Sequence, residues 1–248
     1  MKYSGVITTG ISGRVSDIPA LLHRKSIREY GIHPRETAPG EARNFNVVVS
    51  PLGAGEAKLE ASRCLQCDEI CNVCVSVCPN LANFSYSVDP VCYSLQKAVV
   101  DENGAVSIVN DIEFRVDQSF QVMNIRDLCN ECGNCTTFCP SSGKPFQEKP
   151  GLCLSVKSLN EEQTGFLLNR QSGREVLIYK EKENIRTLTL TGGNYIYETS
   201  QVRAVLRPDD FTIMEMKLLA PCVREARFTF AAWMSIVMKG AIQLKLTH

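Results

Sequence analysis

The chain has 248 residues, of which 44% are hydrophobic and 22% are charged, as in an ordinary globular protein of one or two domains. Lysine plus arginine and aspartate plus glutamate each total 27, so the formal net charge is zero. This balance provides no bulk attraction to nucleic acid or to an anionic membrane, and we expect neither as a partner. The most apolar stretch, Phe228 to Met238, is too short to cross a bilayer as a helix, so we expect no membrane insertion.

The N-terminal region, residues 1–62, is predicted to be an irregular arm that docks on a partner. Glycine and proline recur in it too often for long regular elements. Two short helices are expected within it, one from Asp17 to Tyr30 and one from Ala54 or Gly55 towards Arg63.

The middle region, residues 63–150, contains most of the cysteines and is predicted to be a metal-binding domain with a β insertion at residues 83–125. Alternating apolar and polar residues predict strands in this insertion, and Asp101–Gly104 has the composition of a hairpin turn. Residues 151–248 are predicted to be β-rich. They are expected to end in an apolar helix from Glu215 to about Lys239, divided near Pro221.

Cysteine is the unusual component of this chain, with 12 residues, nine of them in two short clusters. Secreted disulfide frameworks are usually much smaller proteins. The first ten residues also lack the long apolar core of a signal peptide. We therefore expect a cytoplasmic protein whose thiols stay reduced and free to bind metal.

The second cysteine cluster follows the pattern C-x2-C-x2-C-x3-C-P without a defect and ends at Pro140. This spacing wraps a loop around one face of an iron–sulfur cubane, so that three thiolates reach three irons while the fourth points towards another cluster. Gly133 would let the backbone pass close to the cluster, and the proline would start the departing chain. The four predicted ligands are Cys129, Cys132, Cys135 and Cys139.

The first cluster holds five cysteines where four are expected, and it ends in the same way, with Cys78 followed by Pro79. The local ligands can be chosen in two ways. Cys67, Cys71 and Cys74 give gaps of three and two residues, whereas Cys64, Cys67 and Cys74 keep the usual first gap and leave Cys71 out. Spacing alone leaves open whether Cys64 or Cys71 is the spare thiol.

Two motifs that end in Cys-Pro predict two [4Fe–4S] clusters with crossed ligation. One cluster would take its local ligands plus Cys139, and the other would take Cys129, Cys132, Cys135 and Cys78. The alternative is structural zinc, which is commonly held by two C-x2-C pairs. The zinc pattern does not account for two four-cysteine runs that each end in proline. The spacing therefore predicts an α+β fold, a bacterial-type 2[4Fe–4S] ferredoxin-like domain with a β insertion.

The segment around the first motif also resembles a known family. Arg63 to Cys67, preceded by the predicted helix, resembles the iron–sulfur entrance of glutamate synthase small subunits. Residues 71–80 and 127–135 are more similar to the ferredoxin-like C-terminal part of the flavoprotein family named "putative selenate reductase", which is associated with molybdenum hydroxylases of the xanthine dehydrogenase type. The resemblance covers about residues 56–150. Leu81 departs from it, standing where that family would place an arginine.

The resemblance implies an electron-transfer subunit of an oxidoreductase complex, without catalytic residues of its own. The flavin and nucleotide domains of that family are absent from this sequence, so FAD or FMN, NAD(P) and molybdenum cofactor are expected only in partner subunits. The expected partners are a flavoprotein and a molybdenum hydroxylase subunit. Two alternatives stay open: a structural or assembly protein stabilised by metal, and a free ferredoxin carrier.

Overall fold

A computed structural model describes residues 30–63, 71–171 and 173–244 of the chain. The chain divides into two compact units, Met1–Glu69 and Ile70–His248.

The described part of the first unit contains helix α2 (Ala54–Ser62) and an extended segment before it. The Glu56 carboxylate accepts a hydrogen bond from the Gly53 N–H (2.8 Å) at the start of the helix, and the Glu60 carboxylate accepts one from the Ile32 N–H (3.0 Å). The helix predicted from Ala54 towards Arg63 is thus confirmed. Of the helix predicted from Asp17 to Tyr30, residues 17–29 lie outside the described residues.

The second unit is made mainly of strands. Its strands are β1 (Asn83–Ser87), β2 (Val91–Val100), β3 (Val106–Val116), β4 (Phe120–Ile125), β5 (Gly151–Cys153), β6 (Thr164–Gln171), β7 (Arg174–Glu181), β8 (Asn184–Thr191), β9 (Asn194–Glu198), β10 (Val202–Leu206), β11 (Ile213–Leu218) and β12 (Glu225–Arg227). Its helices are α3 (Val73–Ser76), the 3-10 turn η1 (Arg126–Leu128), α4 (Asn134–Thr137), α5 (Pro145–Glu148), α6 (Val156–Glu161) and α7 (Thr229–Gln243).

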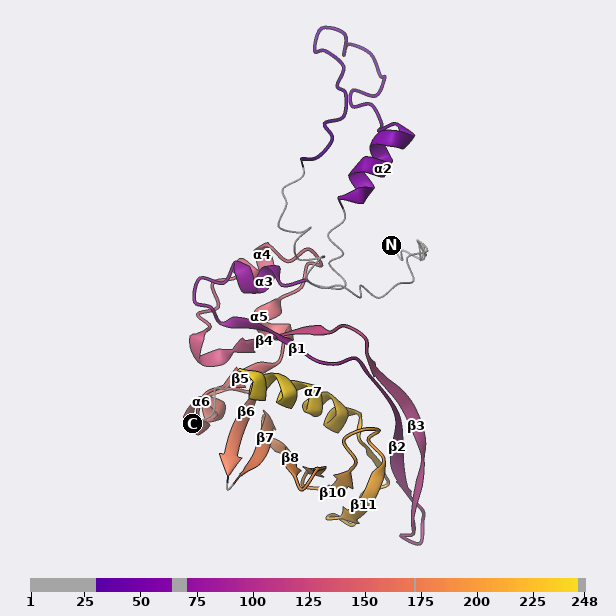
Figure 1. Ribbon diagram of the computed structural model, residues 1–248, viewed down its shortest axis with the longest axis vertical. Coiled ribbons are helices and arrows are strands. Elements are labelled where there is room, and N and C mark those ends of the chain that lie inside the picture. Colours follow the sequence, from indigo (N-terminus) through magenta and orange to yellow (C-terminus); the bar gives the residue numbers. More distant parts are fainter. Residues whose placement is uncertain (1–29, 64–70, 172, 245–248) are drawn as a thin grey trace. The chain divides into compact units, whose positions relative to one another are not determined.

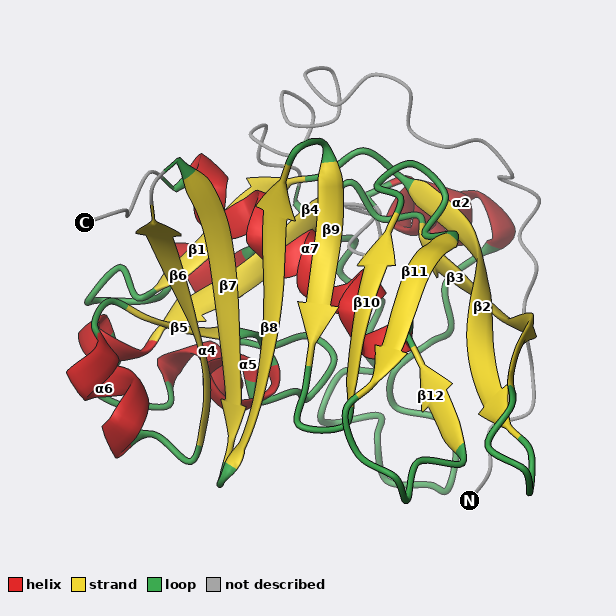
Figure 2. Ribbon diagram, turned by 90° about the horizontal axis from the view of Figure 1, so that it is seen from below, coloured by secondary structure: helices red, strands yellow, loops and turns green. Residues whose placement is uncertain are grey.

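Nine of these strands form one mixed sheet in the order β1-β4-β5-β6-β7-β8-β9-β10-β11. The β4–β5 and β5–β6 pairs are parallel and the other pairs are antiparallel. A smaller sheet has the order β12-β2-β3. The large sheet curves around α7, and the small sheet lies beside the N-terminal end of α7 (Figures 1 and 2).

Residues 83–124 form one long antiparallel ribbon that crosses both sheets. Asn83 pairs with Asn124 in the large sheet, and the same register continues into the β2–β3 pair until a bulge at Leu95. At the far end the chain reverses through the predicted turn, where Gly104 adopts a φ of 83° that favours glycine. The strands predicted between residues 83 and 125 and their hairpin turn are therefore confirmed.

Helix α7 supplies the centre of the core. Its 15 residues are almost entirely apolar, and most of them are buried against the concave side of the large sheet. Gly240 lies so close to the sheet that an added Cβ would be 2.5 Å from the Tyr86 ring and 2.7 Å from Cε of Met123. Since Tyr86 is on β1 and Met123 on β4, the helix packs directly on the strands that flank the cysteine motifs.

The predicted fold class is wrong. Instead of a small α+β ferredoxin-like domain, the second unit is β-rich and dominated by the nine-stranded mixed sheet. The reason lies in β4 and β5, which pair in parallel and carry the sheet on to β6. The strands that flank the cysteine motifs therefore share one sheet and one core with the C-terminal strands.

The C-terminal helix prediction needs a second correction. The segment from Glu215 to Leu218 belongs to strand β11, and the helix begins only at Thr229. This segment pairs with β10 as a strand. From Glu215 to Leu218 its residues alternate between exposed and half-buried, as in a strand with one face towards the core. None of the helices in residues 30–63, 71–171 and 173–244 combines the length and the hydrophobicity that a membrane span requires.

Candidate functional site

The ribbon brings the described part of the first cysteine motif, residues 71–79, beside the second motif. The first motif leads into β1 and the second follows β4, and these strands pair with each other. The short helices α3 and α4 therefore lie in contact. Cys74 of α3 and Cys135 of α4 are each 7% exposed and share a small apolar cluster with Val122. Residues far apart in the sequence thus become neighbours because of one strand pair.

The two cysteine loops repeat the same backbone structure. The matching hydrogen bonds include those from Leu81 N–H to the Cys78 carbonyl and from Ser142 N–H to the Cys139 carbonyl, both 3.2 Å. Leu81 and Ser142 also share a positive φ, 53° and 57°. Pro79 and Pro140 occupy equivalent positions at the start of these turns, each directly after a cysteine. The repeat that the sequence displays as two Cys-Pro endings is therefore also a structural repeat.

One cavity gathers cysteines from both motifs. Three of them come from the second motif (Cys129, Cys132 and Cys135), and Cys78 comes from the first. These are the four residues predicted as one crossed ligand set. The remaining lining residues are Asn80, Asn83, Asn130, Glu131, Gly133, Asn134 and Phe146.

The donor chemistry of this cavity suits an iron–sulfur cluster, because thiolates are the protein ligands of such clusters. Its free volume of about 10 Å3 has room for only one water-sized sphere, so a larger group would require the loop to move outwards. The wall that could move is Asn130–Cys132, which is exposed. Gly133 closes the loop with a φ of 78°, and an added Cβ there would meet no atom within 4 Å.

The other predicted ligands are only partly described. Cys64 and Cys67 lie outside the described residues, so the choice between Cys64 and Cys71 stays open. Cys71 lies close enough to Cys74 to act on it electrostatically. Burial raises the pKa of the Cys74 thiol, and the Lys149 ammonium opposes this shift by favouring the thiolate. The Cys139 thiol lies at the Ser141 and Gly143 turn rather than in the four-cysteine cavity.

Hydrogen bonds reach two of the sulfur atoms. The Ala82 N–H donates to Cys78 Sγ at 3.2 Å, and the Gly143 N–H donates to Cys139 Sγ at 3.3 Å. The Ser141 Oγ lies 3.3 Å from Cys139 Sγ, and its hydrogen bond holds the pKa of the Cys139 thiol below its ordinary value. Such bonds favour a negatively charged sulfur, as a metal ligand must be.

Two further observations concern the hypothesis of a metal site. In residues 30–63, 71–171 and 173–244, no three His, Cys, Asp or Glu side chains converge closely enough to hold a single metal ion. The ten cysteines within these ranges all have free thiols. Of the isolated cysteines, Cys153 is buried, which raises its thiol pKa to about 11, whereas Cys92 and Cys222 are exposed.

A buried polar network beneath the cavity was missed by the sequence analysis. The Asn83 amide donates to the Cys74 carbonyl (2.9 Å), and the Asn124 amide donates to the Asn83 side-chain oxygen (3.0 Å). Arg126 in turn donates to the Asn124 side-chain oxygen (3.1 Å) and to the Phe146 carbonyl. The network thus connects the first motif to the residues that flank the second, Arg126 before it and Phe146 after it. Asparagine is uncommon in strands, so Asn83 and Asn124 at the ends of β1 and β4 were the available signal.

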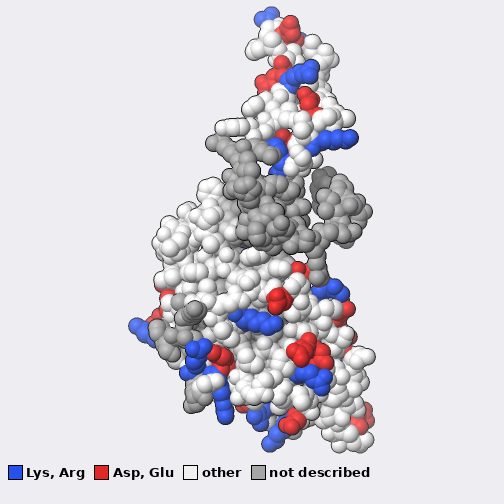
Figure 3. Space-filling view, viewed as in Figure 1, with Lys and Arg blue, Asp and Glu red and all other residues white. Residues whose placement is uncertain are grey.

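The surface over α3 and α4 carries few charged side chains (Figure 3). Residues 71–88 contain no charged residue, and residues 128–143 contain only Glu131. Three large apolar side chains beside the cysteines are exposed: Leu81 (67%), Phe138 (58%) and Leu128 (40%). We call these three residues the apolar rim.

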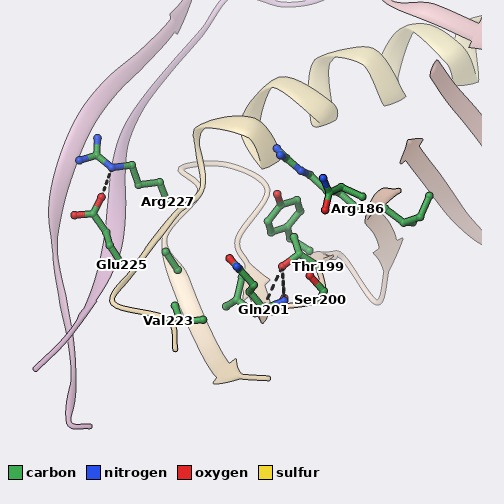
Figure 4. A pocket seen from close by; sticks show the side chains of 12 residues that line it. Arg186, Thr199, Ser200, Gln201, Val223, Glu225 and Arg227 are labelled. Carbon is green, nitrogen blue, oxygen red and sulfur yellow. Dashed lines mark hydrogen bonds and ion pairs between the residues drawn. The ribbon is translucent and has the colours of Figure 1, made fainter. Parts of the chain in front are cut away.

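A second hollow, of about 320 Å3, lies between β12 and the β9–β10 turn (Figure 4). Its two arginines have partners within the unit. Arg227 forms an ion pair with Glu225, and the Arg186 guanidinium lies 4.2 Å from the centre of the Phe230 ring. Thr199 accepts hydrogen bonds from the Gln201 and Val202 N–H groups. The hollow contains no cysteine and has no contact with the predicted site residues.

Comparison with known proteins finds sequence similarity to two proteins that share one name. It is 30% identical over 176 residues to "Putative oxidoreductase YgfK" of Escherichia coli strain K12, and equally so to the protein of the same name in E. coli O157:H7. The alignment covers 66% of this chain but spans only 14% of those relatives. No protein-family model and no solved structure matches the chain.

Proposed function

We propose that this chain is an electron-transfer subunit of a cytoplasmic oxidoreductase, with two [4Fe–4S] clusters bound by its cysteine motifs. The main support is the cavity that Cys78 shares with Cys129, Cys132 and Cys135, because both motifs contribute to it in the crossed arrangement. Four thiols around one cavity are an iron–sulfur donor set. Cys74 and Cys139, with Cys67 and one of Cys64 and Cys71, would serve the second cluster.

The oxidoreductase role is supported by the printed name of the relatives in E. coli. The alignment spans only 14% of the length of those relatives. We propose that the flavin, nicotinamide or molybdenum chemistry of such a complex belongs to partner subunits. A cluster, when bound, supplies one-electron transfer, which can connect to the two-electron chemistry of a flavin. The residues of this chain would hold the clusters, donate hydrogen bonds to their sulfur ligands and exclude water from the buried Cys74 and Cys135.

The apolar rim would provide the docking surface for the electron partner. Cys132 is exposed beside it, so a cluster in the four-cysteine cavity would lie near the surface of this face. Exposed apolar side chains without surrounding charge are typical of protein interfaces. The expected partners are a flavoprotein and a molybdenum hydroxylase subunit.

Anaerobic purification with iron, sulfide and zinc analysis tests this proposal. We expect a brown protein with about eight irons and eight sulfides per chain. Cys132→Ser should lose about half of the iron, whereas Cys222→Ser, which changes an equally exposed cysteine away from the motifs, should keep all of it. A colourless protein with stoichiometric zinc would contradict the proposal and favour a structural role. Iron-loaded protein that purifies without any flavoprotein would favour a free carrier.

A further inference from the structure

We infer that Asn83 donates a hydrogen bond to the cluster held in the four-cysteine cavity and thereby raises the reduction potential of that cluster. This inference rests on the proposed function. It concerns only the site whose four ligands, Cys78, Cys129, Cys132 and Cys135, all lie among the described residues of the second unit.

Two hydrogen bonds fix the orientation of the Asn83 amide. Its Nδ2 donates to the Cys74 carbonyl at 2.9 Å, and its Oδ1 accepts from the Asn124 amide at 3.0 Å. Exchanging the nitrogen and the oxygen of Asn83 would turn an acceptor towards the Cys74 carbonyl, which can only accept. The nitrogen of Asn83 is therefore held at that carbonyl.

One of the two hydrogens on this nitrogen is left uncommitted. A side-chain amide nitrogen has two N–H donors. Within residues 30–63, 71–171 and 173–244, the Cys74 carbonyl is the one acceptor that Asn83 Nδ2 reaches. Bulk water does not serve the second hydrogen, because Asn83 is only 2% exposed. Buried donors nearly always have an acceptor, so an uncommitted one beside a cavity indicates a group that the cavity binds.

Asn83 belongs to a part of the cavity wall that is anchored in the sheet. It lines the cavity from the first position of β1, where it pairs with Asn124 of β4. Admission of a cluster would move the exposed wall, Asn130–Cys132, whereas Asn83 is buried. A cluster between the four thiols would bring acceptor sulfur into the cavity that Asn83 lines.

The other asparagines of this cavity differ from Asn83 in their exposure. Asn80, Asn130 and Asn134 also line it, but all three are exposed. Water can accept their amide hydrogens, so a bond from them to the cluster would only replace a bond to water. The Asn83 hydrogen has no such alternative, and its bond would form in a buried environment where hydrogen bonds are electrostatically stronger.

A hydrogen bond to cluster or ligand sulfur favours the reduced state, because the reduced cluster carries one more negative charge. In the proposed function, the flavoprotein partner supplies one electron to the cluster. No covalent bond forms or breaks in this step, and the amide of Asn83 keeps both of its hydrogens. The residue therefore changes the reduction potential, while the cysteines hold the metal.

Anaerobic redox titration of the purified protein tests the inference, with visible absorption and electron paramagnetic resonance as readouts. Cys132→Ser should lose the cluster of this cavity and so identifies its potential. Asn83→Ala should lower that potential, reducing the equilibrium constant for reduction about tenfold, or about 59 mV. Asn124→Ala is the first control, because it breaks the same buried network although Asn124 is not among the described residues that line the cavity. Asn80→Ala, which removes an exposed amide of the same cavity, is the second. Both controls should keep the potential of the wild type.

A second variant covers the case in which Asn83→Ala folds poorly. Asn83→Asp keeps the shape of the side chain and can still accept the Asn124 amide, but its carboxylate has no N–H to donate. It should lower the same potential by more than Asn83→Ala does, because it also adds a negative charge beside the cluster.

The outcomes separate the inference from the proposed function. If the Asn83 variants keep their iron and sulfide and the potential does not move, the inference is wrong while the proposed function stands. An equal shift in Asn124→Ala would also overturn it, since the change would then reflect loosening of the network. Loss of this cluster in both Asn83 variants, but not in Asn124→Ala, would make Asn83 a structural part of the site and not a donor to the cluster. A wild-type protein without iron and sulfide would overturn both.

Discussion

The side chains of Asn83 and Asn124 are joined by a hydrogen bond of 3.0 Å, and the two residues are only 2% and 0% exposed. They face each other across β1 and β4, at the end of the ribbon where the cysteine loops begin. A buried amide requires hydrogen-bond partners, and both amides have them here. Asn83 donates to the Cys74 carbonyl, and Asn124 accepts from Arg126, which reaches the Phe146 carbonyl.

A double-mutant cycle at this pair should reveal strong coupling. Asn83→Ala and Asn124→Ala should each lower the free energy of unfolding by about 1–3 kcal/mol, because each leaves buried polar groups without a partner. The double variant should lose less than the sum, with a coupling of at least about 0.5 kcal/mol. Urea unfolding measures all three values. Asn110→Ala on exposed β3 is the control, and strictly additive losses would show that the pair is not a unit.

The close approach of α7 to the sheet makes Gly240 intolerant of a side chain. Gly240→Ala would place its Cβ 2.5 Å from the Tyr86 ring, so the helix or the strand must shift. We expect a loss of about 1–3 kcal/mol in the free energy of unfolding, as for overpacked cores, although alanine is the better helix former. Urea unfolding tests this, with Lys239→Ala on the same helix as control. A stabilised Gly240→Ala variant would mean that α7 does not pack this closely.

Much of the local structure follows from the sequence, whereas the overall fold does not. Alternation of apolar residues predicts the strands around Tyr86 and Phe120, and the hairpin turn at Gly104 follows from its residues. The parallel pairing of β4 with β5 leaves no comparable local signal, because it depends on the core beneath them. For the same reason the segment Glu215–Leu218, predicted as the start of the apolar helix, is a strand beside β10.

The candidate site is predictable to a similar degree. Cysteine spacing predicts that Cys78 joins Cys129, Cys132 and Cys135, and the four do line one cavity. The supporting groups have no such pattern. Asn83, Asn124 and Ser141 are ordinary polar residues in the sequence, and their importance depends on which atoms the fold brings beside them.

Burial of tyrosines predicts loss of stability at alkaline pH. Burial raises the pKa of Tyr195 to about 12, and it also raises the pKa of Tyr86 and Tyr197. Because the folded-state pKa lies above the unfolded value of about 10, this contribution is complete below pH 10 and is lost as pH rises towards 12. Between neutral pH and about pH 11, the free energy of unfolding should therefore fall by about 1.4 kcal/mol less in Tyr195→Phe than in the wild type.

Urea unfolding at neutral and alkaline pH measures this difference. Tyr30→Phe, which changes a tyrosine that is 76% exposed, is the control and should leave the alkaline loss unchanged. An identical alkaline loss in the wild type and in Tyr195→Phe would show that the Tyr195 hydroxyl is solvated in the folded protein.

The apolar rim predicts an association with little salt dependence. Exposed Phe138 and Leu81 lie beside cysteine loops that contain almost no charge, so binding there would depend on apolar area rather than on ion pairs. Any flavoprotein that co-purifies with this chain should remain bound between about 0.05 and 0.5 M salt. Phe138→Ser should weaken this association about tenfold or more, because it removes most of a large apolar contact.

Val156→Ser, on α6 and 59% exposed, is the matched control and should bind the partner as the wild type does. Leu81→Asn is a second test, because asparagine accepts the positive φ of 53° at this position and changes only the surface. Sedimentation or biolayer binding with the purified partner measures both. If salt dissociates the complex and Phe138→Ser does not, charged surfaces elsewhere on the chain must hold the partner.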